Sequence, residues 1–136
     1  MSRAIVNFDG GARRNPGPAA IGVVLRNGDG SVVEEVGERI GEATNNVAEY
    51  RALLRGIELA AARGAEDLEL VGDSELVVRQ VEGRYKVKNA GMKELHAEVK
   101  RALGDFDSWS IRHVRRAENA DADRLVNEAL DGVLDG

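Results

Sequence analysis

The sequence has no cysteine among its 136 residues, and this absence excludes two kinds of site. Without thiols, the chain can form neither a disulfide framework nor a thiolate metal centre. No apolar stretch approaches the roughly 20 residues that a membrane-spanning helix needs, and the first residues show no signal-peptide pattern. We therefore expect a soluble protein in a reducing compartment, the cytoplasm, with no membrane partner.

Basic residues are also in the minority. The chain has 19 Lys and Arg against 24 Asp and Glu, a formal net charge of −5 and a pI near 5.1. A typical nucleic-acid-binding domain has the opposite balance. The charge therefore argues against a nucleic-acid ligand unless bound cations change the local field.

The alternation of apolar and polar residues predicts the order of helices and strands. We expect strands at 3–9, 20–26, 32–39, 67–72 and 109–114, and helices at 44–64, 74–82, 91–103 and 122–133. Short turns between the first three strands indicate antiparallel hairpins. The order predicts an α/β fold in which helices pack on a mixed sheet. We expect one domain over residues 1–136, with 131–136 as a frayed end or linker.

Four carboxylates lie where solubility explains an acidic side chain poorly. Asp9 and Asp73 each close an apolar strand, where open α/β sheets place their ligands. Glu49 and Asp123 fall in the first turns of two predicted helices, beside the apolar stripe. Carboxylates gathered in one cleft repel one another unless cations neutralise them. Oxygen ligands alone suit Mg²⁺ or Mn²⁺ rather than zinc, so the four predict a divalent-metal site.

Each carboxylate taken singly also has an ordinary explanation. An Asp at the end of a strand is more often a turn or a helix cap than a ligand, which covers Asp9 and Asp73. Glu49 and Asp123 would be favoured in a first helical turn by the helix dipole. The segment Thr44-Asn45-Asn46 is a helix N-cap whether or not it contacts a ligand. Only the combination favours a metal site.

Five short motifs follow one another along the chain. They are Asp9-Gly10-Gly11, Asn15-Pro16-Gly17-Pro18, Thr44-Asn45-Asn46-Val47-Ala48-Glu49-Tyr50, Gly72-Asp73-Ser74-Glu75, and Glu118-Asn119 with Ala122-Asp123-Arg124-Leu125. Their order and spacing resemble those of the type 1 ribonuclease H family, from residue 3 to about 131. The basic segment 83–89 further resembles the short-loop branch found in archaea and in the N-terminal domains of bifunctional bacterial proteins with a phosphatase-like C-terminal domain.

This resemblance implies a ribonuclease H-like fold with a five-stranded mixed sheet, three antiparallel strands then two parallel ones, and helices on both faces. It also implies an endoribonuclease that hydrolyses the RNA strand of an RNA/DNA hybrid, leaving 5′-phosphate and 3′-hydroxyl ends. Two Mg²⁺ ions, with Mn²⁺ as a substitute, would lie about 3.5–4 Å apart. Asp9 would bridge both ions, Glu49 and Asp73 would complete one site, and Asp123 would mainly hold the other. We expect the enzyme to be a monomer.

The resemblance implies contacts to the substrate as well. The backbone around Gly10 and Gly11, together with Glu49, would sense 2′-hydroxyl groups in the wide minor groove of the hybrid. Contacts to sugar and phosphate would come from Asn15, Thr44, Asn45 and Asn46, with Thr44 near the DNA strand.

Three departures from better-known members are visible. Glu75 takes the place of the Gln that usually follows the Asp-Ser pair and contacts bases in the minor groove. The basic protrusion of those members is reduced to residues 83–89, so we expect modest affinity for substrate. Many members also have a mobile-loop His that assists metal or product release. Counting back from Asn119 aligns His113, which also ends a predicted strand; we favour Arg116 for that role.

Two other classes of function stay open. One is a non-catalytic nucleic-acid-binding domain on the same fold, and the other is a different metal-dependent nuclease or a strand-transfer enzyme. The presence of all four carboxylates argues against the first class. The motif from Thr44 to Glu49 argues against the second.

Overall fold

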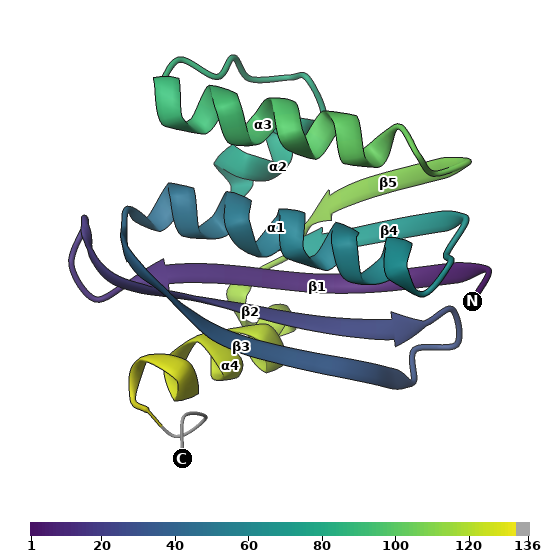
Figure 1. The fold of residues 1–136 in the computed structure, drawn as a ribbon, viewed down its shortest axis with the longest axis horizontal. Coiled ribbons are helices and arrows are strands. Elements are labelled where there is room, and N and C mark those ends of the chain that lie inside the picture. Colours follow the sequence, from purple (N-terminus) through teal and green to yellow (C-terminus); the bar gives the residue numbers. More distant parts are fainter. Residues whose placement is uncertain (133–136) are drawn as a thin grey trace.

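The computed structural model describes residues 1–132 and shows a five-stranded sheet with helices on both faces (Figure 1). The strands are β1 (Arg3–Ala12), β2 (Gly17–Asn27), β3 (Val32–Ala43), β4 (Asp67–Gly72) and β5 (Ser108–His113). The helices are α1 (Asn45–Ala62), α2 (Glu75–Val81), α3 (Ala90–Leu103) and α4 (Ala120–Leu130), the last preceded by the 3₁₀ turn η1 (Arg116–Asn119). No helix in this part of the chain is long and apolar enough to cross a membrane.

The strand order is β3-β2-β1-β4-β5, with antiparallel pairing of β3, β2 and β1 and parallel pairing of β1, β4 and β5. This confirms the predicted sheet of three antiparallel strands followed by two parallel ones. In the central parallel pair, Phe8 of β1 lies opposite Gly72 of β4. The residue that follows each of these is a carboxylate, Asp9 and Asp73, so the register of β1 and β4 alone brings two of the four carboxylates together.

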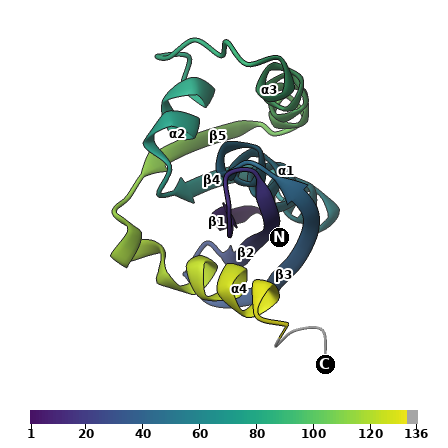
Figure 2. The same cartoon turned by 90° about the vertical axis from the view of Figure 1, so that its left-hand side faces the viewer.

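Successive side chains on a strand point to opposite faces, and each face of β1 and β2 is covered by a different helix. Figure 2 shows α1 on one side of the sheet and α4 on the other. Gly56 of α1 packs on Val6 and Val23, whereas Gly22 of β2 lies against Ala122 of α4. Helix α3 packs on α1, and α2 lies next to β5. The predicted helices on both faces are therefore confirmed.

The ends of several elements differ from the prediction. Strand β1 continues from residue 9 to Ala12, because Gly10, Gly11 and Ala12 pair with residues 19–21 of β2. Strand β3 continues from residue 39 to Ala43, because residues 41–43 pair with residues 17–19 of β2. Small residues carry no apolar alternation, so the sequence pattern ended too early. Of the predicted tail, only Asp131 and Gly132 are described; Val133 and the rest lie outside the described residues. The Asp131 carboxylate pairs with Arg13 at 2.6 Å.

The close approach of α4 to Gly22 generates a first prediction. A methyl group at this position would overlap the carbonyl oxygen of Ala122 and lie 3.1 Å from Cβ of Leu125. Ala normally gains about 0.4–1 kcal/mol over Gly through the unfolded chain. Because a backbone carbonyl cannot rotate away, we expect the overlap to outweigh that gain, and Gly22→Ala to lower the free energy of unfolding by about 1–3 kcal/mol in urea titrations.

A matched control is Gly28→Ala in the β2–β3 turn, where the three atoms nearest to the new methyl all belong to the side chain of Arg3, the closest at 3.3 Å. We expect its free energy of unfolding to stay within about 0.5 kcal/mol of the unaltered protein. Equal stability of the two variants would show that α4 is free to move away from β2.

Candidate metal centre

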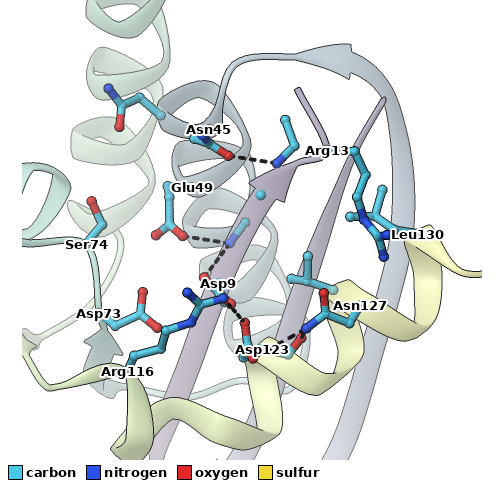
Figure 3. A pocket seen from close by; sticks show the side chains of 15 residues that line it. Asp9, Arg13, Asn45, Glu49, Asp73, Ser74, Arg116, Asp123, Asn127 and Leu130 are labelled. Atoms are coloured by element: carbon cyan, nitrogen blue, oxygen red, sulfur yellow. Dashed lines mark hydrogen bonds and ion pairs between the residues drawn. The ribbon is translucent and has the colours of Figure 1, made fainter. Parts of the chain in front are cut away.

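Three carboxylates from three different elements meet at one edge of the sheet. Asp9 comes from β1, Glu49 from the beginning of α1, and Asp73 from the residue after β4. One oxygen atom from each lies within 4.8 Å of the others, so the three could hold a metal ion. Asp9 lies within the extended β1 rather than at its end, but the neighbouring β4 stops at Gly72 and leaves this edge open. Figure 3 shows the carboxylates pointing into the same cleft.

Gly10 lets Glu49 reach Asp9. A side chain at Gly10 would overlap the backbone of Ala48, so only glycine permits α1 to begin this close to β1. The Gly10 N–H then donates to Asp9 Oδ1 at 3.0 Å and to Glu49 Oε1 at 2.8 Å. One amide therefore holds two carboxylates side by side.

The second oxygen of Glu49 is the strongest sign that a cation fits. Glu49 is 5% exposed, and its Oε2 atom is buried without a hydrogen-bond partner in the part of the chain that the structure describes. A buried polar atom without a partner normally costs about 1–3 kcal/mol. Divalent cations such as Mg²⁺ bind carboxylate oxygen atoms and would supply the missing partner. The residues present therefore fit a divalent metal.

The electrostatics of the cluster lead to the same conclusion. Burial raises the pKa of Asp9 to about 6, the hydrogen bond with Glu49 lowers it, and the charges of Asp73 and Asp123 raise it. Burial, and then Asp9, raise the pKa of Glu49 well above its usual range. Burial also raises the pKa of Asp73, although Asn119 and Arg116 oppose the change. A cation would relieve the repulsion that these shifts reflect.

Asp123 lies across the cleft from these three and is engaged differently. Its Oδ1 atom accepts a hydrogen bond from Arg116 Nη2 at 3.1 Å, and Asn127 Nδ2 donates to its Oδ2 at 3.4 Å. It is not one of the three residues whose oxygen atoms lie within 4.8 Å. Asp123 is still close enough to raise the pKa of Asp9. The fold therefore brings the fourth carboxylate to the same cleft, where it forms an ion pair with Arg116 (Figure 3).

The cleft has a volume of about 510 Å³, and it includes some of the predicted substrate-contacting residues. Gly10, Gly11, Asn45 and Asn46 line it, together with Arg13, Ser74 and Asn127. Asn15, Thr44 and Glu75 are not part of its lining.

Asn15, Thr44 and Glu75, which do not line the cleft, contact other residues of the protein. The Asn45 N–H donates to Asn15 Oδ1 at 3.0 Å, and Thr44 Oγ1 caps α1 by accepting from Val47 N–H at 3.2 Å. Glu75 accepts from the Tyr85 hydroxyl at 3.3 Å. Their contacts to a substrate stay predictions.

Asn119 is the residue of the site that the sequence reasoning undervalued. It is 2% exposed, and its amide donates to Asp73 Oδ2 at 3.4 Å. The pair Glu118-Asn119 was visible as part of a motif, but its place inside the protein was not. His113 ends β5 opposite Gly72, close enough to lower the pKa of Asp73. Because Arg116 also lowers that pKa, the choice between them for the mobile-loop role stays a prediction.

Comparisons with known proteins agree with this fold and site. A family described as reverse transcriptase-like matches residues 7–129. Ribonuclease HI of Halobacterium salinarum is 51% identical over 91% of this chain. Ribonuclease H of Methylococcus capsulatus is 31% identical over 93% of this chain and 88% of its own length. The match over residues 7–129 places the chain in the broad family described as reverse transcriptase-like. The similarity to the two ribonucleases shows that, within this broad family, the chain belongs to the ribonuclease H family.

Solved structures match as well. The crystal structure of RNase H1 from Halobacterium salinarum superposes with a TM-score of 0.93 at 49% identity, covering 96% of this chain and 98% of that one. LC11-RNase H1 in complex with an RNA/DNA hybrid superposes with a TM-score of 0.90 at 44% identity, covering 96% and 99% of the two chains. The chain spans 62% of the length of the Halobacterium Ribonuclease HI sequence.

The raised pKa of Asp9 predicts how stability depends on pH without metal. Its pKa is about 6 in the folded protein against 3.8 for an unperturbed group, so the folded state holds an extra proton between these values. The free energy of unfolding should therefore fall as pH rises from about 4 to about 6, by about 2 kcal/mol. Urea titrations in EDTA should show this decrease for the unaltered protein and a weaker one for Asp9→Asn.

The exchange Asp105→Asn, in the exposed loop after α3, removes the same charge from the surface and serves as the control. Its pH dependence should match that of the unaltered protein. If the free energy of unfolding of Asp9→Asn also fell with pH as it does in the unaltered protein, Asp9 would not change its protonation between pH 4 and 6. The raised pKa of Asp9 would then be wrong.

Proposed function

We propose that this chain is an endoribonuclease that hydrolyses the RNA strand of an RNA/DNA hybrid with two divalent cations, leaving 5′-phosphate and 3′-hydroxyl ends. The observation that carries the proposal is the convergence of Asp9, Glu49 and Asp73 around the unpartnered Glu49 Oε2 in an open cleft. A relative with a TM-score of 0.90, LC11-RNase H1, has been solved in complex with an RNA/DNA hybrid, which supports this substrate.

The four carboxylates would share the work. When bound, Mg²⁺ ions, or Mn²⁺ in their place, activate a water and stabilise the leaving oxygen of a phosphate. Asp9, which has Glu49 and Asp73 on one side and Asp123 on the other, would contribute to both ion sites. Glu49 and Asp73 would complete one of them, and Asp123 would mainly hold the other.

As a ligand, Asp123 would share its carboxylate between the cation and Arg116 or loosen its ion pair with Arg116. The Arg116 side chain is 78% exposed, and exposed ion pairs contribute only about 0–1 kcal/mol. The exchange of partners therefore costs little. Arg116 would remain at the mouth of the cleft, where its guanidinium can contact a phosphate group.

The remaining polar groups of the cleft would position the hybrid. Asn46 and the amide of Asn45 line the cleft and would contact sugar or phosphate. The Asn45 side-chain oxygen accepts from the Ala12 N–H at 2.8 Å, and the Asn45 backbone N–H donates to Asn15 Oδ1. These two hydrogen bonds connect the beginning of α1 to the end of β1 and to the β1–β2 turn. Asn15 would therefore act partly by holding Asn45.

The other parts of the proposal concern the whole protein. We infer one domain over residues 1–136, a monomeric state and a cytoplasmic location.

Other residues would also contact the hybrid. Thr44 would lie near the DNA strand, and Glu75 near the minor groove. Gly10 and Gly11 would approach the 2′-hydroxyl groups through their backbone, with Glu49 beside them.

The central test is a cleavage assay on three substrates: an RNA/DNA hybrid, double-stranded RNA and double-stranded DNA, each with Mg²⁺ or with EDTA. We expect cutting of the RNA strand of the hybrid in Mg²⁺ and none in EDTA. A kinase should label the new 5′ ends only after phosphatase treatment, because those ends carry phosphate. Cutting of double-stranded DNA alone would favour another nuclease on this fold, and hybrid binding without cutting would favour a binding domain.

In the same assay, Asp73→Asn should lose about 100-fold or more of the activity while remaining folded, because a ligand to the cation is lost and like-charge repulsion is relieved. Asp105→Asn should retain normal turnover. Near-normal turnover of Asp73→Asn would mean that Asp73 is not a ligand.

The dependence of binding on salt tests how the hybrid is held. The two arginines at the cleft are each paired with a carboxylate, Arg13 with Asp131 and Arg116 with Asp123. Few phosphates should therefore be neutralised by protein cations. With the inactive Asp73→Asn variant, fluorescence anisotropy should give a slope of log affinity against log salt of about −2 to −4. A slope of about −8 or steeper would reveal a large basic surface that this site does not include.

A further inference from the structure

Three polar side chains form a continuous line of hydrogen bonds that ends on Asp73. Arg26 Nε donates to Asn7 Oδ1 at 3.2 Å, and Asn7 Nδ2 donates to Asn119 Oδ1 at 3.2 Å. Asn119 Nδ2 then donates to the Phe8 carbonyl at 2.9 Å and to Asp73 Oδ2 at 3.4 Å. We call Arg26, Asn7 and Asn119 the polar relay. It connects β2, β1 and η1 to a proposed metal ligand.

The relay occupies the face of the sheet that α4 covers. Asn7 lies two residues before Asp9 on β1 and therefore points to the same face. Arg26 of β2 lies opposite Ile5 of β1, so it is the diagonal neighbour of Asn7. The Arg26 side chain is only 23% exposed, and its other nitrogen atoms donate to the Gly30 carbonyl at 3.2 Å and to Asp121 at 2.9 Å.

Both ends of the relay fix its direction. A guanidinium group can only donate hydrogen bonds, so the Asn7 side chain must present its oxygen to Arg26 and its NH₂ group to Asn119. A backbone carbonyl can only accept, so Asn119 must present its NH₂ group to Phe8 and its oxygen to Asn7. The two amides are thereby set in one orientation, and that orientation directs an N–H at the carboxylate of Asp73.

We propose that Arg26 and Asn7 are positioning residues, which hold the Asn119 amide so that it donates to Asp73 and keeps that carboxylate turned into the metal cluster. This inference rests on the proposed function, because it concerns the holding of a ligand to the proposed cations. Reversal of the Asn119 amide would place its oxygen against the Phe8 carbonyl and the Asp73 carboxylate. Two acceptors facing each other repel, so Asp73 would lose its fixed position.

The exchange Asn7→Asp tests the direction of the relay with almost no change of shape. The new carboxylate can accept from Arg26 but cannot donate to Asn119. Charge alone would strengthen cation binding, because a further negative group is added on the face that carries Asp9. Loss of the N–H group that Asn7 donates to Asn119 predicts weaker cation binding instead. The sign of the change in cation affinity therefore separates the two effects.

The measurement is calorimetric binding of Mn²⁺ to the full chain without nucleic acid, followed by kcat and KM on the hybrid. We expect Asn7→Asp to bind Mn²⁺ about tenfold more weakly and to lose kcat by about tenfold, with KM within about twofold. The matched control is Asn27→Asp, the same exchange at an exposed position of β2 whose amide contacts Ser31. This variant should behave as the unaltered protein does.

A second pair of variants covers the case in which Asn7→Asp fails to fold by circular dichroism. Arg26→Met removes the donor, whereas Arg26→Lys keeps a group that only donates. We expect weaker Mn²⁺ binding for Arg26→Met and recovery to within about threefold for Arg26→Lys. Unchanged or tighter Mn²⁺ binding by folded Asn7→Asp or Arg26→Met would overturn the relay. If the unaltered protein bound no Mn²⁺, the proposed function would fail, and the relay with it.

Discussion

The repulsion among two buried carboxylates, Asp9 and Glu49, and a partly buried third, Asp73, is the constraint on which this structure depends. Asp9 and Glu49 are 7% and 5% exposed, and burial together with mutual repulsion raises their pKa values. Solvent is largely excluded, so only hydrogen-bond donors or cations can stabilise these charges. The fold supplies few donors, chiefly the Gly10 amide for two of the carboxylates and the Asn119 amide for Asp73. The centre is therefore electrostatically incomplete without a cation, as a metal-dependent site requires.

The rest of the fold can be understood as the means of bringing these charges together. The parallel pairing of β1 with β4 sets Asp9 beside Asp73, and the absence of a side chain at Gly10 lets α1 bring Glu49 alongside. On the other face, Gly22 lets α4 approach β2 and carry Asp123 to the cleft. Glu49 and Asp123 thus each depend on close contact between a helix and a strand, where an added methyl group has no room.

Much of this arrangement could be predicted from the sequence, because apolar periodicity and order along the chain are local signals. The strand ending before Asp73 and the helix beginning after Thr44 follow from such signals, and so does the placing of two carboxylates at one edge of the sheet. The extension of β1 through Gly10 to Ala12 could not be predicted, since small residues show no alternation. Nor could the burial of Asn119, because a polar side chain inside a protein depends on partners that the fold brings from elsewhere.

An acidic protein proposed to bind a polyanion presents an electrostatic problem, and the surface resolves part of it. Along β3, acidic side chains alternate between the two faces and pair with arginines of the covering helices, with Glu34–Arg63 and Glu38–Arg55 on the α1 side and Glu35–Arg124 on the α4 side. These three glutamates are thus neutralised locally and away from the cleft.

Within the cleft, two divalent cations would balance the four carboxylates and leave Arg116 as the surplus charge at its mouth, because Arg13 is paired with Asp131. On this account, cations would be needed for holding the hybrid as well as for the chemistry. Removing them would restore a cluster of negative charges directly beneath the phosphate that must bind there.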